Sequence, residues 1–231
     1  TELSQRFDVT EETIRRDLER LELEGLITRT HGGAVLKVEN MFDRLGYTHR
    51  SRTNVEEKKK IAQIVASIIP MQATLFADAS STVMEALTLM ADRDDITVLT
   101  NSIPVLSSLN QSGLNIMSTG GANNRVSCSL QGIIARTTIM NYHVDFVLTS
   151  CKGLKLDEGA YDSREGETEI KQLMISRGQK TIMMADHTKF DRTSFVKYCS
   201  FQQIDILVTD RRPADEWMEL LEEYQIRILY P

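Results

Sequence analysis

The chain of 231 residues lacks any apolar run near the roughly 20 residues that a membrane-spanning helix needs, and it does not open with the basic, apolar and small-residue pattern of a signal peptide. Cysteine is scarce: Cys128, Cys151 and Cys199 are odd in number and widely separated, which argues against a disulfide framework or a zinc site. The four histidines are equally scattered, so we expect no metal ligands among them. These absences predict a cytoplasmic protein, away from the membrane, with no metal and no cofactor.

Positive charge is in the minority, because the formal net charge is -6. This acidity disfavours broad, nonspecific adhesion to nucleic acid, but it permits specific binding through a local basic patch. The hydrophobic content of 41% and the charged content of 26% are ordinary for a globular protein and exclude wholesale disorder. The length suggests one large domain or two unequal ones.

A short helix is expected near the beginning of the chain, from about Glu11 to Glu24. Thr10 is a good N-cap, Glu11 and Glu12 suit the positive end of the helix dipole, and Gly25 is a good stop signal. The two ends of this segment therefore both carry the residue types that start and stop a helix.

The two faces of this helix differ in character. At about 100° per residue, an apolar face forms from Ile14, Leu18 and Leu21. The residues that face outward are Thr13, Arg16 and Arg20, with Arg15 at the flank. In one interpretation the arginines only solvate the helix and pair with Glu11, Glu12 and Glu19 at helical spacing. In the other they bind DNA.

The neighbouring segments favour DNA binding. Leu3 and Phe7 are spaced i, i+4 on a preceding helix, and residues 8–9 leave room only for a tight helix-helix corner. After the second helix, "LITRT" and "AVLKV" flank "HGG" and predict a β-hairpin wing with residues 31–33 at its tip. In such a module the second helix enters the major groove, where arginines reach guanine edges or phosphates, and the wing lies near adjacent phosphates or the minor groove.

A larger domain follows a connector. Residues 38–55 are polar, basic around "HRSRTN" and poor in apolar periodicity, which predicts a linker between a first domain of residues 1–37 and a second of residues 56–231. The second domain opens on an amphipathic helix with Ile61, Ile64, Val65 and Ile68 on one face and Pro70 as its stop. Strand-like runs then alternate with helical stretches: "TLFAD", "ITVLT", "LNIMST", "DFVLTS", "KTIMMAD", "IDILVTD" and "IRILY". The alternation predicts an α/β domain with a doubly wound, mostly parallel sheet, because parallel strands need helical crossovers.

Small and polar residues follow the carboxyl ends of these runs, which is where such sheets bind ligands. They are Ser80, Ser81 and Thr82; Thr100, Asn101 and Ser102; Gly120 and Gly121; Ser150, Lys152 and Gly153; and Asp186 and Lys189. Hydroxyls and free amide N–H groups at a helix N-terminus can hold a phosphate, glycines allow its close approach, and lysines add charge. Each loop alone fits an ordinary capping turn. Together, at one edge of one sheet, they predict a site for a small anionic, hydroxylated ligand.

The stretch "VTEETIRRDLERLELEGLITRTHGGAVL" resembles the N-terminal winged helix-turn-helix of the DeoR-type bacterial transcriptional regulators, whose motif has Ser/Thr, two residues, then Thr-Ile-Arg-Arg-Asp-Leu. Matching positions are Thr10, Thr13, Ile14, Arg15, Arg16, Asp17 and Leu18. The resemblance implies double-stranded operator DNA as a partner, contacted by Thr10, Thr13, Arg15, Arg16, Arg20, His31 and Gly32. Family members carry a further helix before the equivalent of Thr1, and the first seven residues already have a mid-helix pattern, so we expect this domain to be truncated.

The resemblance continues through the second domain. "LTNS", "GG", "DSREGETEIKQLM" and "ADHTKF" match the sensor domain of the same family, and "ADASST" is similar to its Asp-x-Gly-Thr-Thr loop with Ser80 in place of glycine. This sensor shares its fold with ribose-5-phosphate isomerase, so the resemblance implies a phosphorylated sugar as effector. The implied pocket residues are Asp78, Ser81, Thr82, Thr100, Asn101, Gly121, Lys152, Glu167 and Lys189. The segment with Glu165, Glu167 and Glu169 equally suits a solvated helix start, the expected role of two of the three.

A sugar-phosphate isomerase is the rival interpretation. Such an enzyme needs a carboxylate base and an acid or lysine that stabilises the enediolate. Where the isomerase relatives have an Asp-Gly-Ala-Asp-type loop, this chain has Ser150-Cys151-Lys152-Gly153 without carboxylates, although Glu167 and Lys189 remain. Cys151 beside Lys152 also suggests a nucleophile, but no histidine stands at a recognisable spacing.

The combination of a winged helix and a sugar-phosphate pocket therefore predicts a regulator and not an enzyme. We expect a repressor of a sugar-catabolism operon that leaves its operator when a phosphorylated sugar binds. Symmetric DNA half-sites require paired DNA-binding domains, which predicts a homodimer or homotetramer.

Overall fold

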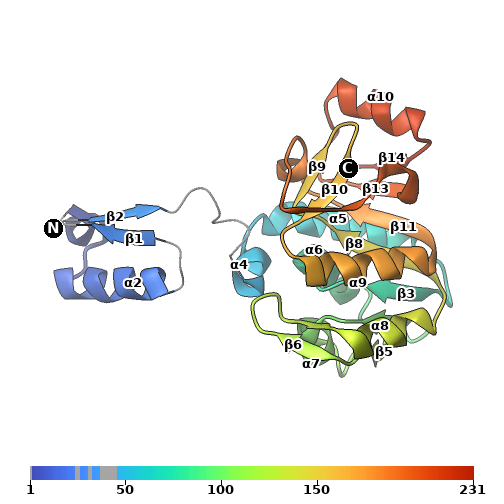
Figure 1. The fold of residues 1–231 in the computed structure, drawn as a ribbon, viewed down its shortest axis with the longest axis horizontal. Helices are drawn as coiled ribbons and strands as arrows, with labels where there is room; N and C mark the ends of the chain where they lie inside the picture. Colours follow the sequence, from blue (N-terminus) through green and yellow to red (C-terminus); the bar gives the residue numbers. More distant parts are fainter. Residues whose placement is uncertain (1, 24–26, 31–32, 37–45) are drawn as a thin grey trace. The chain divides into compact units, whose positions relative to one another are not determined.

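The computed structural model describes residues 2–23, 27–30, 33–36 and 46–231. It separates into two compact units, Thr1–Leu45 and Gly46–Pro231 (Figure 1). Helix α4 (Tyr47–Arg52) opens the second unit and lies within the range that the sequence suggests as a linker. None of the helices in the described ranges combines the length and the apolar character needed to cross a membrane.

The first unit is a helix pair followed by a hairpin. Helix α1 (Glu2–Phe7) leads through a short turn to α2 (Glu11–Leu23), and β1 (Ile27–Thr30) pairs antiparallel with β2 (Gly33–Leu36). The expected N-cap is formed, because the Thr13 amide donates to Thr10 Oγ1 at 3.2 Å. The predicted order of helix, tight corner, helix and wing is confirmed in these residues.

The second unit contains a seven-stranded sheet in the order β14-β13-β11-β8-β3-β4-β5. Its strands are β3 (Thr74–Ala77), β4 (Thr97–Thr100), β5 (Asn115–Ser118), β8 (Val144–Ser150), β11 (Gly178–Met184), β13 (Ile206–Val208) and β14 (Arg227–Leu229). All neighbouring pairs are parallel. Each strand overlaps one of the predicted runs, although β8 begins one residue and β11 two residues before its run. The strand order reverses between β3 and β8, as it does at the switch point of a doubly wound sheet.

Helices cover both faces of this sheet (Figure 1). Successive strand residues alternate between two cores: Leu75 and Ala77 pack on one side, while Phe76 packs on the other. Helices α5 (Val55–Ile68), α6 (Ser81–Leu89) and α7 (Ile103–Ser108) share the first core. Helices α8 (Ile133–Met140), α9 (Glu165–Ser176) and α10 (Asp215–Glu223) share the second.

Short antiparallel strands that the sequence did not suggest complete the unit. They are β6 (Ala122–Asn124), β7 (Ser129–Gln131), β9 (Gly153–Lys155), β10 (Gly159–Asp162) and β12 (Val196–Cys199). β6 pairs with β7, and β10 lies between β9 and β12. With three or four residues each, these strands are too short to show a periodic pattern. The hairpin of β6 and β7 and the small sheet of β9, β10 and β12 both lie beside the carboxyl ends of the large sheet's strands, and both bring side chains toward those ends.

Candidate functional site

The carboxyl ends of the strands meet at one edge of the sheet. In register, Ala77 pairs with Thr100 and Leu148, Thr100 with Ser118, and Met184 with Ser150. Since adjacent strands are about 4.8 Å apart, the loops that follow β3, β4, β5, β8 and β11 leave the sheet side by side. Apart from Glu167 on α9 and Thr100, which ends β4, the residues predicted for the effector site all belong to these loops or to the helical turns that they open.

Asp78 occupies the switch point between β3 and β8. It is almost fully buried, and its carboxylate accepts hydrogen bonds from the Ser80 amide at 2.9 Å, Thr149 Oγ1 at 2.8 Å and the Ser150 amide at 3.1 Å. These bonds tie the loop after β3 to the end of β8. Asp78 thus shapes the crevice in which doubly wound sheets bind their ligands.

Lys171 on α9 is a residue of this edge that the sequence analysis missed. Its ammonium lies 3.1 Å from Asp78 Oδ2 and 2.6 Å from Asp162 Oδ2, and it donates to the Ser150 carbonyl. All three charged side chains are buried. A signal was present, because Lys171 follows Glu167 by four residues and shares a helix face with the buried Ile170 and Met174.

The buried charges perturb one another. Burial opposes the charged forms, but the Lys171 ammonium outweighs it and lowers the pKa of Asp162. Likewise burial would lower the pKa of Lys171, but Asp162 and Asp78 raise it well above its ordinary value. The cluster therefore holds a lysinium between carboxylates, and Asp162 is a weak proton acceptor.

Glu167 is the buried member of the three glutamates that open α9, whereas Glu165 is exposed and Glu169 pairs with Arg136 at 2.9 Å. The Glu167 carboxylate accepts hydrogen bonds from the Ser129 hydroxyl and the Gln131 amide, both on β7. These bonds join the start of α9 to the hairpin of β6 and β7.

Asn101 lies where this hairpin meets the end of β4. Its Nδ2 donates to the Leu130 carbonyl at 3.2 Å, and its backbone carbonyl accepts from the Leu130 amide at 2.8 Å. Within the described part of the chain, Asn101 Oδ1 is buried without a hydrogen-bond partner. A buried acceptor of this kind costs about 1–3 kcal/mol unless something donates to it, so it marks a position suited to a ligand hydroxyl.

The neighbouring loops present backbone amides and glycines. Ser80 precedes α6 in an N-cap position without a side-chain capping bond, and Ser81 and Thr82 are buried in its first turn. Gly120 and Gly121 have φ of 63° and 112°. A Cβ on Gly121 would lie 2.4 Å from the Gln131 carbonyl oxygen, so no larger residue fits there. Thr100 and Ser102 are buried, and the Ser102 hydroxyl accepts from the Val105 amide at 3.4 Å.

The cationic side of the edge comes from the loops after β8 and β11. Lys152 and Lys189 are partly buried, and the charge of Lys189 acts on the thiol of Cys151. Asp186 is buried and accepts from the Thr188 amide at 3.0 Å and from Asn54 Nδ2 at 3.1 Å. This part of the edge can offer lysine side chains to an anion while Asp186 orders the turn that carries Lys189.

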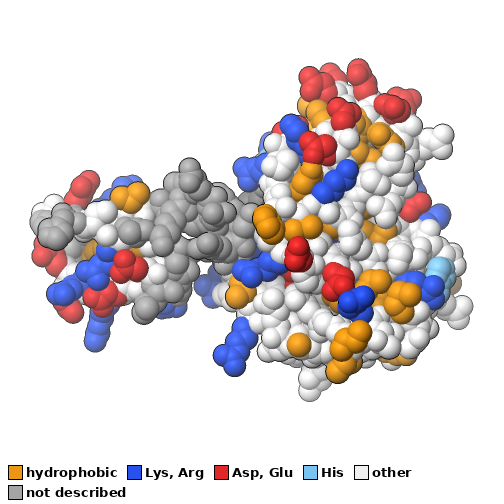
Figure 2. Space-filling view, viewed as in Figure 1, with side chains coloured by type: hydrophobic (Ala, Val, Ile, Leu, Met, Phe, Trp, Pro, Cys, Tyr) orange, Lys and Arg blue, Asp and Glu red, His pale blue; other side chains and the backbone are white. Residues whose placement is uncertain are grey.

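The arginines of α2 face solvent, whereas Ile14, Leu18 and Leu21 are half-buried. In Figure 2, Arg side chains lie beside Asp and Glu side chains over this helix. The Arg15 side chain is 65% exposed, with Nε 3.7 Å from Glu19 Oε1. An exposed pair at this distance contributes little to stability, so it leaves Arg15 available to another partner. Thr13 and Arg16 are also exposed. His31 and Gly32, expected at the wing tip, lie outside the described residues.

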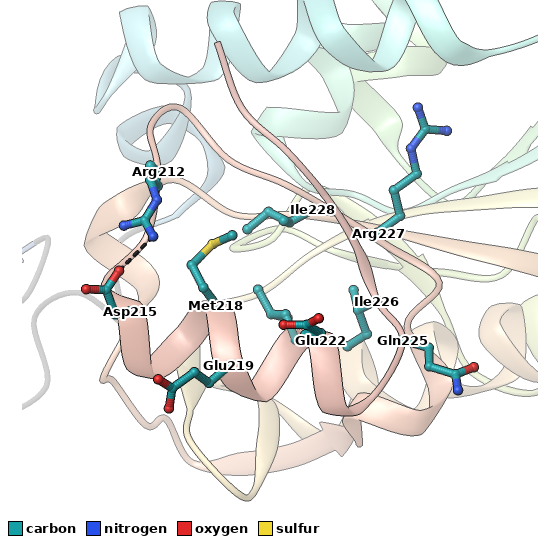
Figure 3. A pocket seen from close by; sticks show the side chains of 10 residues that line it. Arg212, Asp215, Met218, Glu219, Glu222, Gln225, Ile226, Arg227 and Ile228 are labelled. Carbon is teal, nitrogen blue, oxygen red and sulfur yellow. Dashed lines mark hydrogen bonds and ion pairs between the residues drawn. The ribbon is translucent and has the colours of Figure 1, made fainter.

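A groove of about 550 Å³ lies elsewhere, between α10 and the edge strand β14 (Figure 3). Met218, Leu221, Ile226 and Ile228 give it an apolar floor, and Arg212 and Glu219 stand among its charged lining. None of the predicted effector residues lines it.

The geometry bears on the enzyme alternatives. Asp78 and Glu167 are engaged by the donors described above, and Lys171 holds Asp162 ionised, so these carboxylates are committed to the fold. Burial raises the pKa of Cys151 to about 12, which leaves the thiol protonated and weakly nucleophilic. In the described ranges, no group of three or more His, Cys, Asp or Glu side chains is arranged to hold a metal ion.

Comparison with known proteins identifies both units. Residues 1–40 match the DeoR-like helix-turn-helix domain, and residues 53–211 match the DeoR C terminal sensor domain. The uncharacterized HTH-type transcriptional regulator YulB of Bacillus subtilis is 36% identical over 99% of this chain and 88% of its own length. The HTH-type transcriptional repressor GlcR of the same organism is 34% identical over 96% and 86%.

Among solved structures, ribose 5-phosphate isomerase A of Methanocaldococcus jannaschii is similar, with a TM-score of 0.46 and 10% identity over 60% of this chain and 55% of that chain. The family matches cover both units in their order along the chain, and the helix-turn-helix relatives are named as regulators and not as enzymes. The chain belongs to the DeoR family of transcriptional regulators.

Proposed function

We propose that this regulator represses a sugar-catabolism operon, binds the operator through α2, and leaves it when a phosphorylated sugar occupies the strand-end edge of the second unit. The observation that carries the proposal is that β3, β4, β5, β8 and β11 all end at one edge of the sheet, so the loops that follow them lie side by side. Relatives carry names of the same kind, such as the glycerol-3-phosphate regulon repressor of Escherichia coli.

The DNA contacts come from the exposed face of α2. Arg15 and Arg16 bind guanine edges or phosphates, Thr13 and Thr10 approach the backbone, and Arg20 adds charge. The wing residues His31 and Gly32 reach the adjacent phosphates or minor groove. A protein of net charge -6 meets DNA through this local patch.

The effector site divides into two chemical halves. The amides at the start of α6, the glycine loop after β5, and the ammonium groups of Lys152 and Lys189 suit a phosphate. Asn101 Oδ1, which lacks a donor in the described structure, accepts from a sugar hydroxyl. Ser81, Thr82 and the hydroxyls at Thr100 and Ser102 complete the polar lining, while Asp78, Glu167 and Asp186 hold the loops in place.

Regulation requires that the effector bind more tightly to the arrangement that does not bind DNA. Operators with two-fold symmetry need two DNA-binding domains, so the working form is a homodimer or homotetramer. It acts in the cytoplasm, where the chromosome lies. Sedimentation equilibrium of the full chain measures this directly, and a monomer at the concentrations that bind DNA would contradict it.

The function is tested with a panel of glucose 6-phosphate, fructose 6-phosphate, ribose 5-phosphate and glycerol 3-phosphate, and with a DNA duplex selected by the protein from a random pool. Isothermal titration measures binding, and fluorescence anisotropy of the labelled duplex measures release. We expect one compound to bind and to release the duplex at fixed salt. Tighter DNA binding with the compound would contradict release by the effector. Turnover of any panel member would favour the isomerase alternative.

A further inference from the structure

Helix α4 is the first described element after the segment that joins the two units, and it is bonded to the loops of the strand-end edge. The Tyr47 amide donates to the Val126 carbonyl at 2.9 Å, next to the hairpin of β6 and β7. The Arg50 guanidinium donates to the Ala79 carbonyl at 3.5 Å, and the Ser81 hydroxyl donates to the Arg50 carbonyl at 3.3 Å. A six-residue helix thus contacts both the loop after β3 and the hairpin.

The corner between α4 and α5 is closed by a buried lysine. Lys58 is 5% exposed, and its ammonium donates to the Thr53 carbonyl at 2.6 Å and to the Arg50 carbonyl. Carbonyls at a helix C-terminus carry partial negative charge, which a cation satisfies. Lys58 therefore joins the end of α4 to the first turns of α5.

Asn54, at the apex of this corner, connects it to the loop after β11. Its backbone is in the left-handed region with φ of 51°, and its side chain does not cap α5. Instead, Asn54 Nδ2 donates to Asp186 Oδ1 at 3.1 Å and to Thr188 Oγ1 at 3.2 Å. The same Asp186 oxygen accepts from the Thr188 amide at 3.0 Å, so Asn54 and the turn that carries Lys189 share one acceptor.

We propose that the corner formed by α4, Asn54 and Lys58 is the relay by which effector occupancy reaches the DNA-binding unit. Ser81 opens α6, and Asp186 lies in the loop after β11. The proposed function assigns both positions to the effector edge, and each residue has a hydrogen bond to the corner. An effector that draws these loops toward itself changes the partners of Arg50 and Asn54, and the corner moves with them. This inference rests on the proposed function, whose site it uses as the input.

The test variant is Asn54→Gly in the full chain. Glycine keeps the left-handed backbone without strain and removes only the side-chain bonds. Gln72→Gly is the matched control, because Gln72 also has a positive φ, of 59°, is exposed, and precedes β3 at the opposite edge of the sheet. Thermal unfolding verifies that both variants are folded.

Two quantities are measured for each protein: the affinity for the panel sugar phosphate that binds the wild type, and the ratio of duplex affinities without and with that compound. A wild-type ratio of about tenfold or more is ordinary for allosteric coupling. We expect Asn54→Gly to bind sugar phosphate and duplex as the wild type does, with a ratio that falls to about one. Gln72→Gly should keep the wild-type ratio.

A measurement on the wild type alone makes the test independent of the variant. Saturation with the sugar phosphate should change the hydrogen exchange of the amides in residues 47–54 as well as in residues 78–82. An unchanged ratio in Asn54→Gly, loss of sugar-phosphate binding in that variant, or exchange changes confined to residues 78–82 would each overturn the relay and leave the proposed function standing. If no panel member binds the wild type, both proposals fall together.

Discussion

Replacing Lys171 with methionine is expected to destabilise the second unit strongly. The ammonium lies 2.6 Å from Asp162 and 3.1 Å from Asp78 in a buried cluster. Methionine fills a similar volume but leaves two buried carboxylates without a counter-ion, a change that costs about 3–5 kcal/mol when one partner of a buried pair is removed. For a domain of this size, about 2–4 °C per kcal/mol corresponds to a melting temperature lowered by about 6–20 °C.

The loss should also depend on pH. In the wild type the lowered pKa of Asp162 gives stability that is present above the ordinary carboxyl value of about 4 and is lost as the pH falls through the folded-state value. In Lys171→Met, burial without a counter-ion raises the pKa of the same group, so protons stabilise the variant. The difference in unfolding free energy between the two proteins therefore narrows between pH 7 and about pH 4.

Urea unfolding provides the assay, with the fluorescence of Trp217 as the signal. Trp217 is the single tryptophan of the chain and is buried on α10 in the second unit. Lys180→Met, at an exposed position of β11, is the matched control and should change stability by about 0.5 kcal/mol or less. A loss below about 1 kcal/mol in Lys171→Met, or a loss that stays constant down to pH 4, would refute this description of the buried cluster.

Three further predictions concern other parts of the chain. Arg15→Ala and Arg16→Ala should each weaken specific duplex binding by about 1–3 kcal/mol at fixed salt, measured by anisotropy with Arg211→Ala as the control; wild-type affinity in both would remove α2 from the interface. Gly121→Ala should lower stability and sugar-phosphate affinity more than Gly132→Ala, because a Cβ on Gly121 meets the Gln131 carbonyl at 2.4 Å while one on Gly132 meets nothing within 4 Å; equal effects in calorimetry would contradict this. Cys151, buried and with its pKa raised to about 12, should react with iodoacetamide at pH 8 far more slowly than the more accessible Cys128, and mass spectrometry showing equal rates would disprove it.

The sequence could predict the large sheet because each of its strands carries a run of apolar side chains long enough to recognise. Leu75, Phe76 and Ala77 are buried on both faces of the sheet, and such runs stand out from the helices between them. Parallel pairing then follows from the helical crossovers, and it brings the strand ends to one edge. The N-cap at Thr10 and the outward arginines follow from local rules in the same way.

The connections across that edge could not be predicted, because they join residues far apart in sequence through side chains of ordinary type. The helix face of Lys171 indicates burial, but the pattern of α9 does not name Asp78 and Asp162 as its partners. Asn54 appears as a polar residue of the expected linker, and its bond to Asp186 spans 132 positions. The local sequence does not predict these strands, because tertiary packing decides where they form. They are β6, β7, β9, β10 and β12.

The location of the effector site is tested most directly by a crystal structure of the full chain with the panel sugar phosphate that binds it. We expect density for the compound at the shared edge, with its phosphate at the start of α6 and the glycine loop and a hydroxyl donating to Asn101 Oδ1. Density in the groove between α10 and β14, with the strand-end edge unoccupied, would contradict it.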